Sequence, residues 1–441
     1  MAEEVALLVG LKLTGRSAQR ASSNIPESII TAEESLDELQ ALAESAGARV
    51  AEKWIQTRAR AEAATFIGSG KVEELKAQIE FHEVTTLIVD QELSPTQQRN
   101  LERALDVKVL DRTQLILDIF ARRARTREGQ LQVELAQLNY MLPRLTGKGA
   151  AMSRLGGGIG TRGPGETKLE TDRRRIHQRI QSIEKDLDRV RGGRTTQRRQ
   201  RQAVPLATLA LVGYTNAGKS TLFNRLTGAG VYADAKMFAT LDPTVRQIRL
   251  PSRRQVLVSD TVGFIRNLPT TLVRAFRATL EEVVEAELLL HVVDASSPAA
   301  AEQTAHVLAT LNEIGAAETP QILVLNKIDL ITNEPDKDTK ALARRILGDP
   351  EHQPAGAVGI SAFSGDGFDR LLAKIDETLA LDPVSPCVFR FPIGEGGPLH
   401  LLHEHARVTS KTYDDDSCLV QAVVPASIRR RLADYVVESG E

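Results

Sequence analysis

The segment that most constrains the fold is GYTNAGKS at residues 213–220. It directly follows ATLALV at 207–212, an uninterrupted apolar run typical of a buried strand, and from Thr221 onward the sequence favours a helix. Closely spaced glycines let a backbone wrap around a phosphate group, so that amides of the loop and of the helix N-terminus face its oxygens. The pattern predicts a P-loop within a parallel α/β sheet.

Individual residues of this loop have expected roles. Lys219 reaches the β- and γ-phosphates of a nucleotide, and the Ser220 hydroxyl is a ligand of Mg²⁺. The residues predicted to contact the nucleotide here are Gly213, Tyr214, Thr215, Asn216, Ala217, Gly218, Lys219, Ser220 and Thr221.

A second motif follows another buried strand, QILVLN at 321–326, and selects the base. In the sequence Asn326, Lys327, Ile328, Asp329, the Asp329 carboxylate accepts two hydrogen bonds from guanine N1–H and its 2-amino group. Asn326 helps to hold the base edge and the P-loop, and the aliphatic stem of Lys327 covers the base plane. Adenine lacks this pair of donors, so the motif predicts guanine specificity.

A further base contact is expected after the last strand of this region, in GISA at 359–362. The Ala362 N–H is placed to bond guanine O6, and Ser361 and Phe363 are included in the predicted GTP site.

Two switch segments complete the nucleotide site. DTVG at 260–263 follows a strand at 255–259, so Asp260 is expected to act on Mg²⁺ through a water and the Gly263 N–H to sense the γ-phosphate. In FATLD at 238–242, Thr240 is the predicted second Mg²⁺ ligand, with Thr244 as the alternative. The catalytic set is Lys219, Thr240 and Gly263. The switch residues assigned to GTP are Phe238, Ala239, Thr240, Leu241, Asp242, Asp260, Thr261, Val262 and Gly263.

The residue after the DxxG glycine is Phe264, where many related GTPases have a glutamine that orients the attacking water. A phenylalanine side chain can neither donate nor accept a hydrogen bond in that role. We expect slow hydrolysis by the protein alone, with a partner completing the hydrolytic site.

The remainder of the chain predicts a multidomain α/β protein. We expect an N-terminal α/β domain at 1–128, a helical hairpin with a glycine-rich tip and a basic linker at 129–203, a P-loop GTPase domain with a mostly parallel sheet at 204–380, and a small C-terminal α+β domain at 381–441. Strands are expected at 5–13, 86–89 and 107–110, and surface helices at 31–46 and 71–82.

The predicted hairpin has two arms. Leu131, Leu135, Leu138 and Leu142 lie on one helical face at 130–142, and a charged helix follows at 167–191, before Gly192 and Gly193 interrupt an arginine-rich hinge. The intervening glycine-rich stretch carries Lys148, Arg154 and Arg162 and has no acid from 147 to 165. These three residues are candidates for contact with RNA phosphates, and a solvated loop is the alternative.

Composition restricts the setting but not the function. The net charge is -2, so a nucleic-acid contact must be local, and Cys387 and Cys418 fit neither a zinc spacing nor a disulfide framework. No apolar run is long enough to cross a bilayer, and the first ten residues do not resemble a signal peptide. We expect a cytoplasmic, monomeric protein.

The motifs together resemble the HflX family of ribosome-associated GTPases. TNAGKST, FATLDPT, DTVGFIRNLP and NKID carry the resemblance, as do ATFIGSGKVEEL at 64–75, QVELAQLNYMLPRL at 132–145 and GGGIGTRGPGETKLETDRRRI at 156–176. The resemblance implies GTP hydrolysis with Mg²⁺, binding to the large ribosomal subunit and its RNA, stimulation there, and the splitting or rescue of stalled ribosomes under stress. It also supports Ser220 and Thr240 as Mg²⁺ ligands, and it leaves open a second nucleotide site in the N-terminal domain.

Two other functions stay open from the residues alone. One is a signalling switch whose hairpin captures a protein partner. The other is a nucleic-acid-binding module with a merely structural GTP site. The sequence GSGK at 68–71 lacks the P-loop spacing and is interpreted as a turn, and His400, His403 and His405 are interpreted as surface residues rather than a metal site.

Overall fold

The structure is a computed structural model of the chain. Contacts divide it into two compact units: Met1–Arg194 with Asp234–Asp242 and Arg266–Ala278, and Thr195–Ala233 with Pro243–Ile265 and Thr279–Glu441. The described residues are 4–14, 32–147, 164–202, 206–228, 237–238, 240–266, 277–331, 338–348, 354–379, 384–392, 396–413, 417–425, 428–429 and 432–437. The predicted multidomain α/β class is confirmed.

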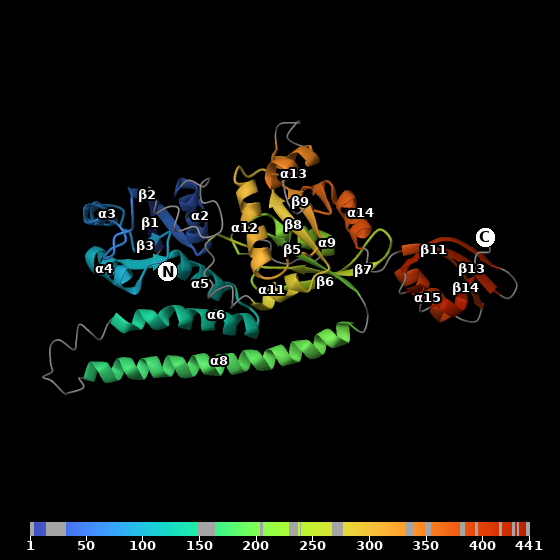
Figure 1. Cartoon of the computed structure of the whole chain (residues 1–441), viewed down its shortest axis with the longest axis horizontal. Helices are drawn as coiled ribbons and strands as arrows, with labels where there is room; N and C mark the ends of the chain where they lie inside the picture. Colours follow the sequence, from blue (N-terminus) through green and yellow to red (C-terminus); the bar gives the residue numbers. More distant parts are fainter. Residues whose placement is uncertain are drawn as a thin grey trace. The chain divides into compact units, whose positions relative to one another are not determined.

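The first unit contains a four-stranded parallel sheet in the order β2-β1-β3-β4, and helices connect successive strands along the chain (Figure 1). Its core is formed by apolar strand residues such as Leu7 and Leu87, which are fully buried. The half-exposed edge strand β2 was missed because its residues show no clear alternation. The elements are β1 (Glu4–Leu13), α2 (Ala32–Ser45), β2 (Ala48–Arg58), α3 (Ser69–Phe81), β3 (Thr86–Val89), α4 (Pro95–Leu105), β4 (Lys108–Asp111) and α5 (Arg112–Arg123).

The helical hairpin consists of α6 (Arg127–Met141), the 3-10 turn η1 (Leu142–Gly147) and α8 (Pro164–Gln202), and it belongs to the first unit as far as Arg194 (Figure 1). Leu131 packs against Ile183 and Leu187, with Leu135 and Leu138 partly buried beside them, so the predicted apolar face is confirmed for these three leucines, while Leu142 begins η1. The Arg179 guanidinium also pairs with the Glu134 carboxylate through two hydrogen bonds of 2.7 Å.

The prediction that glycines interrupt the second arm was wrong, because α8 continues through Gly192 and Gly193 to Gln202. A glycine in a helix costs only about 1 kcal/mol relative to alanine, and the surrounding arginines and glutamines are good helix formers. The candidate RNA contacts Lys148, Arg154 and Arg162 lie outside the described residues.

The second unit contains a six-stranded sheet in the order β10-β9-β8-β5-β7-β6, in which only β6 runs antiparallel to its neighbour. The parallel strands all end at one edge of the sheet, and their carboxyl ends carry the predicted nucleotide motifs. The elements are β5 (Ala207–Gly213), α9 (Lys219–Thr227), β6 (Thr244–Arg249), β7 (Gln255–Asp260), α11 (Arg277–Val284), β8 (Leu288–Asp294), α12 (Ala300–Glu313), β9 (Gln321–Asn326), η2 (Ile328–Leu330), α13 (Thr339–Leu347), β10 (Gly356–Gly359) and α14 (Phe368–Thr378).

The C-terminal part of this unit forms a separate antiparallel sheet in the order β12-β13-β11-β14. Phe389, Phe391 and Val420 are buried in its own core, and both Cys387 and Cys418 are free thiols. Among the described helices of the whole chain, none is long and apolar enough to cross a membrane. The elements are β11 (Val384–Pro392), α15 (Gly396–His405), β12 (Arg407–Tyr413), β13 (Ser417–Pro425), η4 (Ala433–Tyr435) and β14 (Val436–Val437).

Candidate functional site

The P-loop joins β5 to α9, and its backbone requires glycine at two positions. Gly213 has a φ of 150°, and a Cβ there would come 2.2 Å from the Val292 carbonyl oxygen. Gly218 has a φ of 94°, and a Cβ there would come 2.2 Å from Asn326 Nδ2. Both glycines are therefore fixed by close packing against the carboxyl ends of β8 and β9, which brings the loop backbone to the edge where the other motifs lie.

Lys219 begins α9 with its side chain buried. Its Nζ donates hydrogen bonds to the carbonyl oxygens of Gly213 at 3.1 Å and Tyr214 at 2.7 Å, so the amine lies under the loop. Burial lowers the pKa of Lys219 to about 8, and the negative charge of Asp260 partly opposes this. Phosphate groups bound in the loop would favour the charged ammonium again.

Two of the predicted magnesium ligands, Ser220 and Asp260, lie together at the start of α9 and the carboxyl end of β7. Ser220 Oγ donates to Asp260 Oδ2 at 2.8 Å, and Asp260 is fully buried. A hydroxyl and a carboxylate are oxygen ligands of the kind that Mg²⁺ prefers, so this donor set fits the metal. Thr215 Oγ1 is also buried, with no hydrogen-bond partner among the described residues, which leaves a polar atom in the loop for a ligand.

The DxxG segment lies directly against the P-loop. The Phe264 N–H donates to the Gly213 carbonyl oxygen at 3.1 Å, and the Phe264 carbonyl oxygen accepts from the Thr215 N–H at 2.8 Å. A Cβ on Gly263 would come 2.9 Å from Thr215 Cα and 3.0 Å from Lys219 Nζ. The predicted γ-phosphate sensor is therefore adjacent to the P-loop lysine, while the side chain of Phe264 is buried.

The predicted base site is held together by Asn326. Its Nδ2 donates to the Ala217 carbonyl oxygen at 2.8 Å, and its Oδ1 accepts from the Ala362 N–H at 2.9 Å. One buried amide thus joins three of the motifs. In this structure the Ala362 N–H donates to Asn326 Oδ1. A hydrogen bond from the Ala362 N–H to guanine O6 therefore stays a prediction. Asp329 lies exposed in η2, and Phe363 is 85% exposed.

Lys327 has a partner that the sequence reading missed. Its Nζ contacts Asp294 Oδ2 at 2.6 Å, and its φ of 62° turns the chain sharply between β9 and η2. The ion pair fixes the stem whose expected role is to cover the base. Asp294 ends the buried strand β8 at the same sheet edge as the other motifs. This position in the sequence could have identified Asp294 as a residue of the nucleotide site.

The switch segment around Thr240 packs within the first unit. Phe238, which has a φ of 56°, makes an edge contact with Phe120 at a ring-centroid distance of 4.5 Å. Asp242 accepts hydrogen bonds from the backbone N–H groups of Arg125 at 2.8 Å and Thr126 at 2.9 Å. Thr240 is buried between these two anchors. Ala239 lies outside the described residues, and nucleotide contacts of this segment stay predictions.

The segment that follows the DxxG motif also reaches the first unit, at Arg266. Its Nε and Nη2 both contact Glu38 Oε2, at 3.0 and 2.9 Å. Glu38 in turn accepts from Arg112, whose other Nη contacts Asp90 at 2.8 Å. Arg266 therefore completes a buried network of two guanidinium groups and two carboxylates.

The mostly parallel sheet carries the P-loop, the buried Asp260 with the DxxG glycine, and the Asn326–Ala362 link, all at the carboxyl ends of its parallel strands. This arrangement defines a P-loop GTPase, the class predicted from the sequence.

Three family models match consecutive regions of the chain. They are described as GTP-binding GTPase N-terminal at residues 33–121, GTP-binding GTPase Middle Region at 123–201, and 50S ribosome-binding GTPase at 208–327. The GTPase HflX of Caldanaerobacter subterraneus subsp. tengcongensis is 48% identical over 92% of this chain and 91% of its own length. The GTPase HflX of Escherichia coli K12 is 43% identical over 90% of this chain and 92% of its own length.

The chain belongs to the HflX family of GTPases, and it hydrolyses GTP. Among solved structures, a GTP-binding protein of Sulfolobus solfataricus in complex with GDP is 26% identical, with a TM-score of 0.45, and the alignment covers 85% of this chain and 98% of that one.

Proposed function

We propose that the GTP-bound protein binds the large ribosomal subunit and helps to split or rescue stalled ribosomes under stress, with slow hydrolysis by the protein alone and stimulation by the ribosome. The observation that carries the proposal is the match of residues 208–327 to the family described as 50S ribosome-binding GTPase. We further propose that the protein is cytoplasmic and monomeric.

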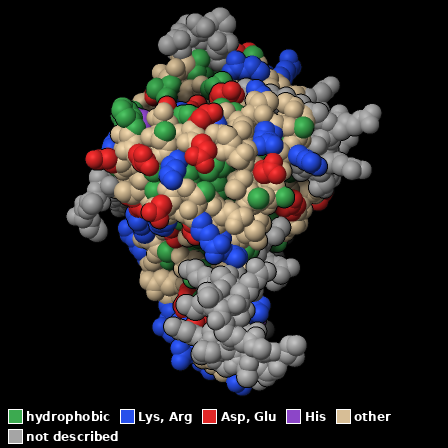
Figure 2. Space-filling model, turned by 90° about the vertical axis from the view of Figure 1, so that its left-hand side faces the viewer, with side chains coloured by type: hydrophobic (Ala, Val, Ile, Leu, Met, Phe, Trp, Pro, Cys, Tyr) green, Lys and Arg blue, Asp and Glu red, His purple; other side chains and the backbone are tan. Residues whose placement is uncertain are grey.

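The hairpin supports a contact with RNA. The stretch of α8 from 173 to 183 contains four arginines and no acid, and Arg173, Arg174 and Arg175 are exposed. Figure 2 shows Lys and Arg side chains at the lower edge of the view, with both signs of charge interspersed above them. Local positive charge of this kind attracts RNA phosphates although the net charge of the chain is -2.

For the chemistry, Lys219 and the P-loop amides hold the β- and γ-phosphates, Asp329 selects guanine, and Gly263 contacts the γ-phosphate. Ser220 and Thr240 would hold Mg²⁺ directly and Asp260 would do so through a water; the metal supplies neutralisation of the charge that develops during phosphoryl transfer. In this structure the Thr215 N–H donates to the Phe264 carbonyl oxygen. A phosphate oxygen that accepts from the Thr215 N–H must therefore displace this hydrogen bond.

Phe264 gives a physical reason for slow hydrolysis. Its side chain is buried and has no polar atom, so it cannot orient a water for attack on the γ-phosphate. A group supplied by the ribosome would complete the site.

The test is GTP hydrolysis by the full chain alone, with isolated large subunits, and with small subunits as the control, at two salt concentrations. We expect stimulation by large subunits that weakens at the higher salt, because each phosphate contact releases counterions. No stimulation by large subunits would refute ribosomal activation and favour a protein partner for the hairpin. Sedimentation of intact ribosomes, with protein and a non-hydrolysable GTP analogue, tests splitting separately.

A further inference from the structure

Positive charge gathers at one end of the six-stranded sheet, on β6 and on its turn to β7 (Figure 1). From 243 to 259 the chain contains four arginines and no acidic residue, although the whole chain has 58 acidic and 56 basic residues. Three of the four, Arg246, Arg249 and Arg253, are exposed. β6 is the last strand of the sheet, so no described strand pairs with its outer edge. We call this outer edge, with these three arginines, the β6 edge.

The charges of the three arginines are not neutralised within the described part of the protein. Arg246 Nη1 donates to the Val245 carbonyl oxygen at 2.9 Å, and Arg253 Nη1 donates to the His403 carbonyl oxygen at 3.3 Å. Both acceptors are uncharged. None of the three guanidinium groups forms an ion pair with a residue that the structure describes, so the β6 edge presents positive charge to solvent.

Arg254, the fourth arginine of the run, has a structural role instead. It is buried, its Nη1 donates to the Leu379 carbonyl oxygen at 2.6 Å, and its Nε lies 4.0 Å from Asp376 Oδ1. Asp376 also accepts from the Ser252 N–H at 2.9 Å and from the Ser252 hydroxyl at 2.7 Å. The turn is therefore fixed on the end of α14, and the half-buried Asp376 is engaged by Ser252 and Arg254.

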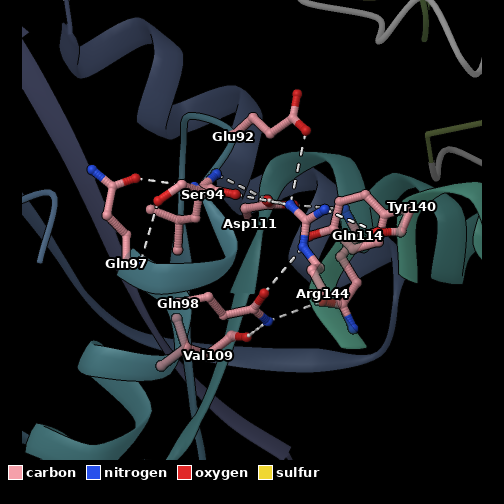
Figure 3. A network of polar contacts seen from close by, with 10 residues as sticks. Glu92, Ser94, Gln97, Gln98, Val109, Asp111, Gln114, Tyr140 and Arg144 are labelled. Carbon is pink, nitrogen blue, oxygen red and sulfur yellow. Dashed lines mark hydrogen bonds and ion pairs between the residues drawn. The ribbon is translucent and has the colours of Figure 1, made fainter. Parts of the chain in front are cut away.

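A comparison with Arg144 shows how this chain uses another arginine to join elements. The Arg144 guanidinium donates to the carbonyl oxygens of Tyr140 at 3.0 Å and Leu93 at 2.8 Å, to Asp111 Oδ2 at 3.2 Å and to Gln98 Oε1 at 3.2 Å (Figure 3). Arg246 and Arg249 have no comparable set of acceptors among the described residues. Most of their N–H donors are therefore available to a ligand.

The backbone of Arg253 is an independent indication. Its φ of 67° lies in the left-handed region, where glycine is preferred because a side chain crowds the backbone. The Arg253 N–H donates to the Leu250 carbonyl oxygen at 2.8 Å, and the Leu250 N–H donates to the Arg254 carbonyl oxygen at 2.9 Å. Neither hydrogen bond needs the arginine side chain. The turn thus holds an arginine at a conformational cost, which points to a use of this side chain outside the turn.

The chemistry of the β6 edge fits a chain of phosphate groups. A guanidinium group can donate two parallel hydrogen bonds to one phosphate. Successive side chains of a strand alternate between its faces, so Arg246 and Arg249 flank the open edge, with Cα atoms about 10 Å apart. A single phosphate cannot contact both arginines at that separation, whereas a polynucleotide backbone, with a phosphate at every nucleotide, can.

We infer that the β6 edge is a second RNA-binding surface, on which Arg246, Arg249 and Arg253 contact phosphates of ribosomal RNA. The inference rests on the proposed function, binding to the large ribosomal subunit, and adds a contact separate from the helical hairpin. β6 begins at Thr244 and β7 ends at Asp260. RNA on this edge therefore contacts one of the two strands that connect the switch segments.

The first experiment measures binding of the full chain, with a non-hydrolysable GTP analogue, to isolated large subunits by sedimentation at several salt concentrations. R246Q/R249Q should bind roughly tenfold or more weakly, and the slope of log affinity against log salt should be smaller by about two units, one for each lost phosphate contact. R246K/R249K keeps both charges, so its slope should equal that of the wild type. The GDP affinity of each variant checks its fold.

The matched control is R344Q, which removes an exposed arginine from α13, a helix that packs against β10 at the opposite end of the same sheet. It should bind large subunits like the wild type, with the same salt slope. R253G tests the turn. Its thermal midpoint should stay the same or rise, because glycine prefers this backbone conformation, while its affinity for large subunits should fall roughly threefold or more.

Directed cleavage identifies the partner as RNA. An iron chelate attached to Q247C, between the two strand arginines, should cut the RNA backbone of large subunits at a confined set of nucleotides. The same chelate on R344C should leave those nucleotides intact. Wild-type protein treated with the reagent corrects for Cys387 and Cys418.

Three results would overturn the inference. Equal subunit affinity of R246Q/R249Q and wild type would show that the edge makes no contact. An equal loss of salt slope in R344Q would show a general effect of net charge. Loss of affinity without RNA cleavage from Q247C would show that a ribosomal protein contacts the edge. Absence of binding by the wild-type chain would instead refute the proposed ribosomal function, a result distinct from any difference between variants.

Discussion

At the scale of single residues, Asp329 has the most specific predicted role. Asp329 is exposed in η2, three residues after Asn326, and its carboxylate is predicted to accept both guanine donors. D329N replaces one acceptor by a donor that faces another donor, so GDP affinity should fall by about two orders of magnitude or more. Fluorescent GDP titration measures the loss, and xanthosine diphosphate should bind the variant better than GDP does.

The matched control is D369N, which changes an exposed carboxylate on α14. It should bind GDP like the wild type. Equal GDP affinity in D329N and wild type would contradict the assignment of Asp329 to the base.

Lys219 provides a prediction about pH. Its pKa of about 8 lies below its ordinary value of 10.5 because the amine is buried. Between these two values the unfolded chain holds more protons at this site than the folded one, so the nucleotide-free fold gains stability from this lysine as pH rises through that window. Phosphates favour the ammonium, so GDP binding near pH 8 should take up about half a proton.

Calorimetric titrations of GDP in buffers with different ionisation enthalpies measure this uptake. At pH 6.5 the lysine is already charged in the free protein, so the same titrations should show no uptake by it. Equal proton uptake at the two pH values would contradict the assigned pKa shift.

At the scale of elements, the switch segment and α6 depend on the same carboxylate. Asp242 accepts three hydrogen bonds at the start of α6, from two backbone N–H groups and the Thr126 hydroxyl, and it crowds Gly129. D242A should destabilise the first turn of α6 by about 0.5–2 kcal/mol, the range for loss of a helix cap.

Native-state hydrogen exchange at residues 127–130 measures the effect of D242A. D338A, which removes the side-chain cap of α13, should speed exchange at α13 and leave α6 unchanged. Unchanged protection of α6 in D242A would show that this carboxylate does not stabilise the helix.

At the scale of the whole molecule, the hairpin and the nucleotide site have separate cores. Ile183 is fully buried between α6 and α8, while the P-loop rests on the core of the six-stranded sheet. I183A should destabilise the α6–α8 packing by about 2–5 kcal/mol through the lost contacts and the cavity left behind. Exchange along α8 should become faster while GDP affinity stays the same. A parallel loss of GDP affinity would show that the two cores are energetically coupled.

Much of the nucleotide site was predictable because its motifs are local. The P-loop, Asp260, Asn326 and Asp329 each follow a buried strand, and strand order in a parallel sheet brings such positions to one edge. The predicted apolar face of α6 was confirmed for the same reason, since helical periodicity is local. The prediction that the helix ends before Gly192 was wrong, because the two glycines were given more weight than the helix-forming residues around them.

The sequence by itself determined the class of fold, the GTPase class and the family, because short spacings encode loops, strand ends and hydrogen-bonding groups. Only the tertiary structure decided that Asp294 holds Lys327, that Asp242 holds the N-cap residue Thr126 of α6, and that Arg266 contacts Glu38. Each of these contacts joins residues from different elements. Whether two such residues come close in space depends on how their elements pack, and no periodicity along the chain encodes that packing.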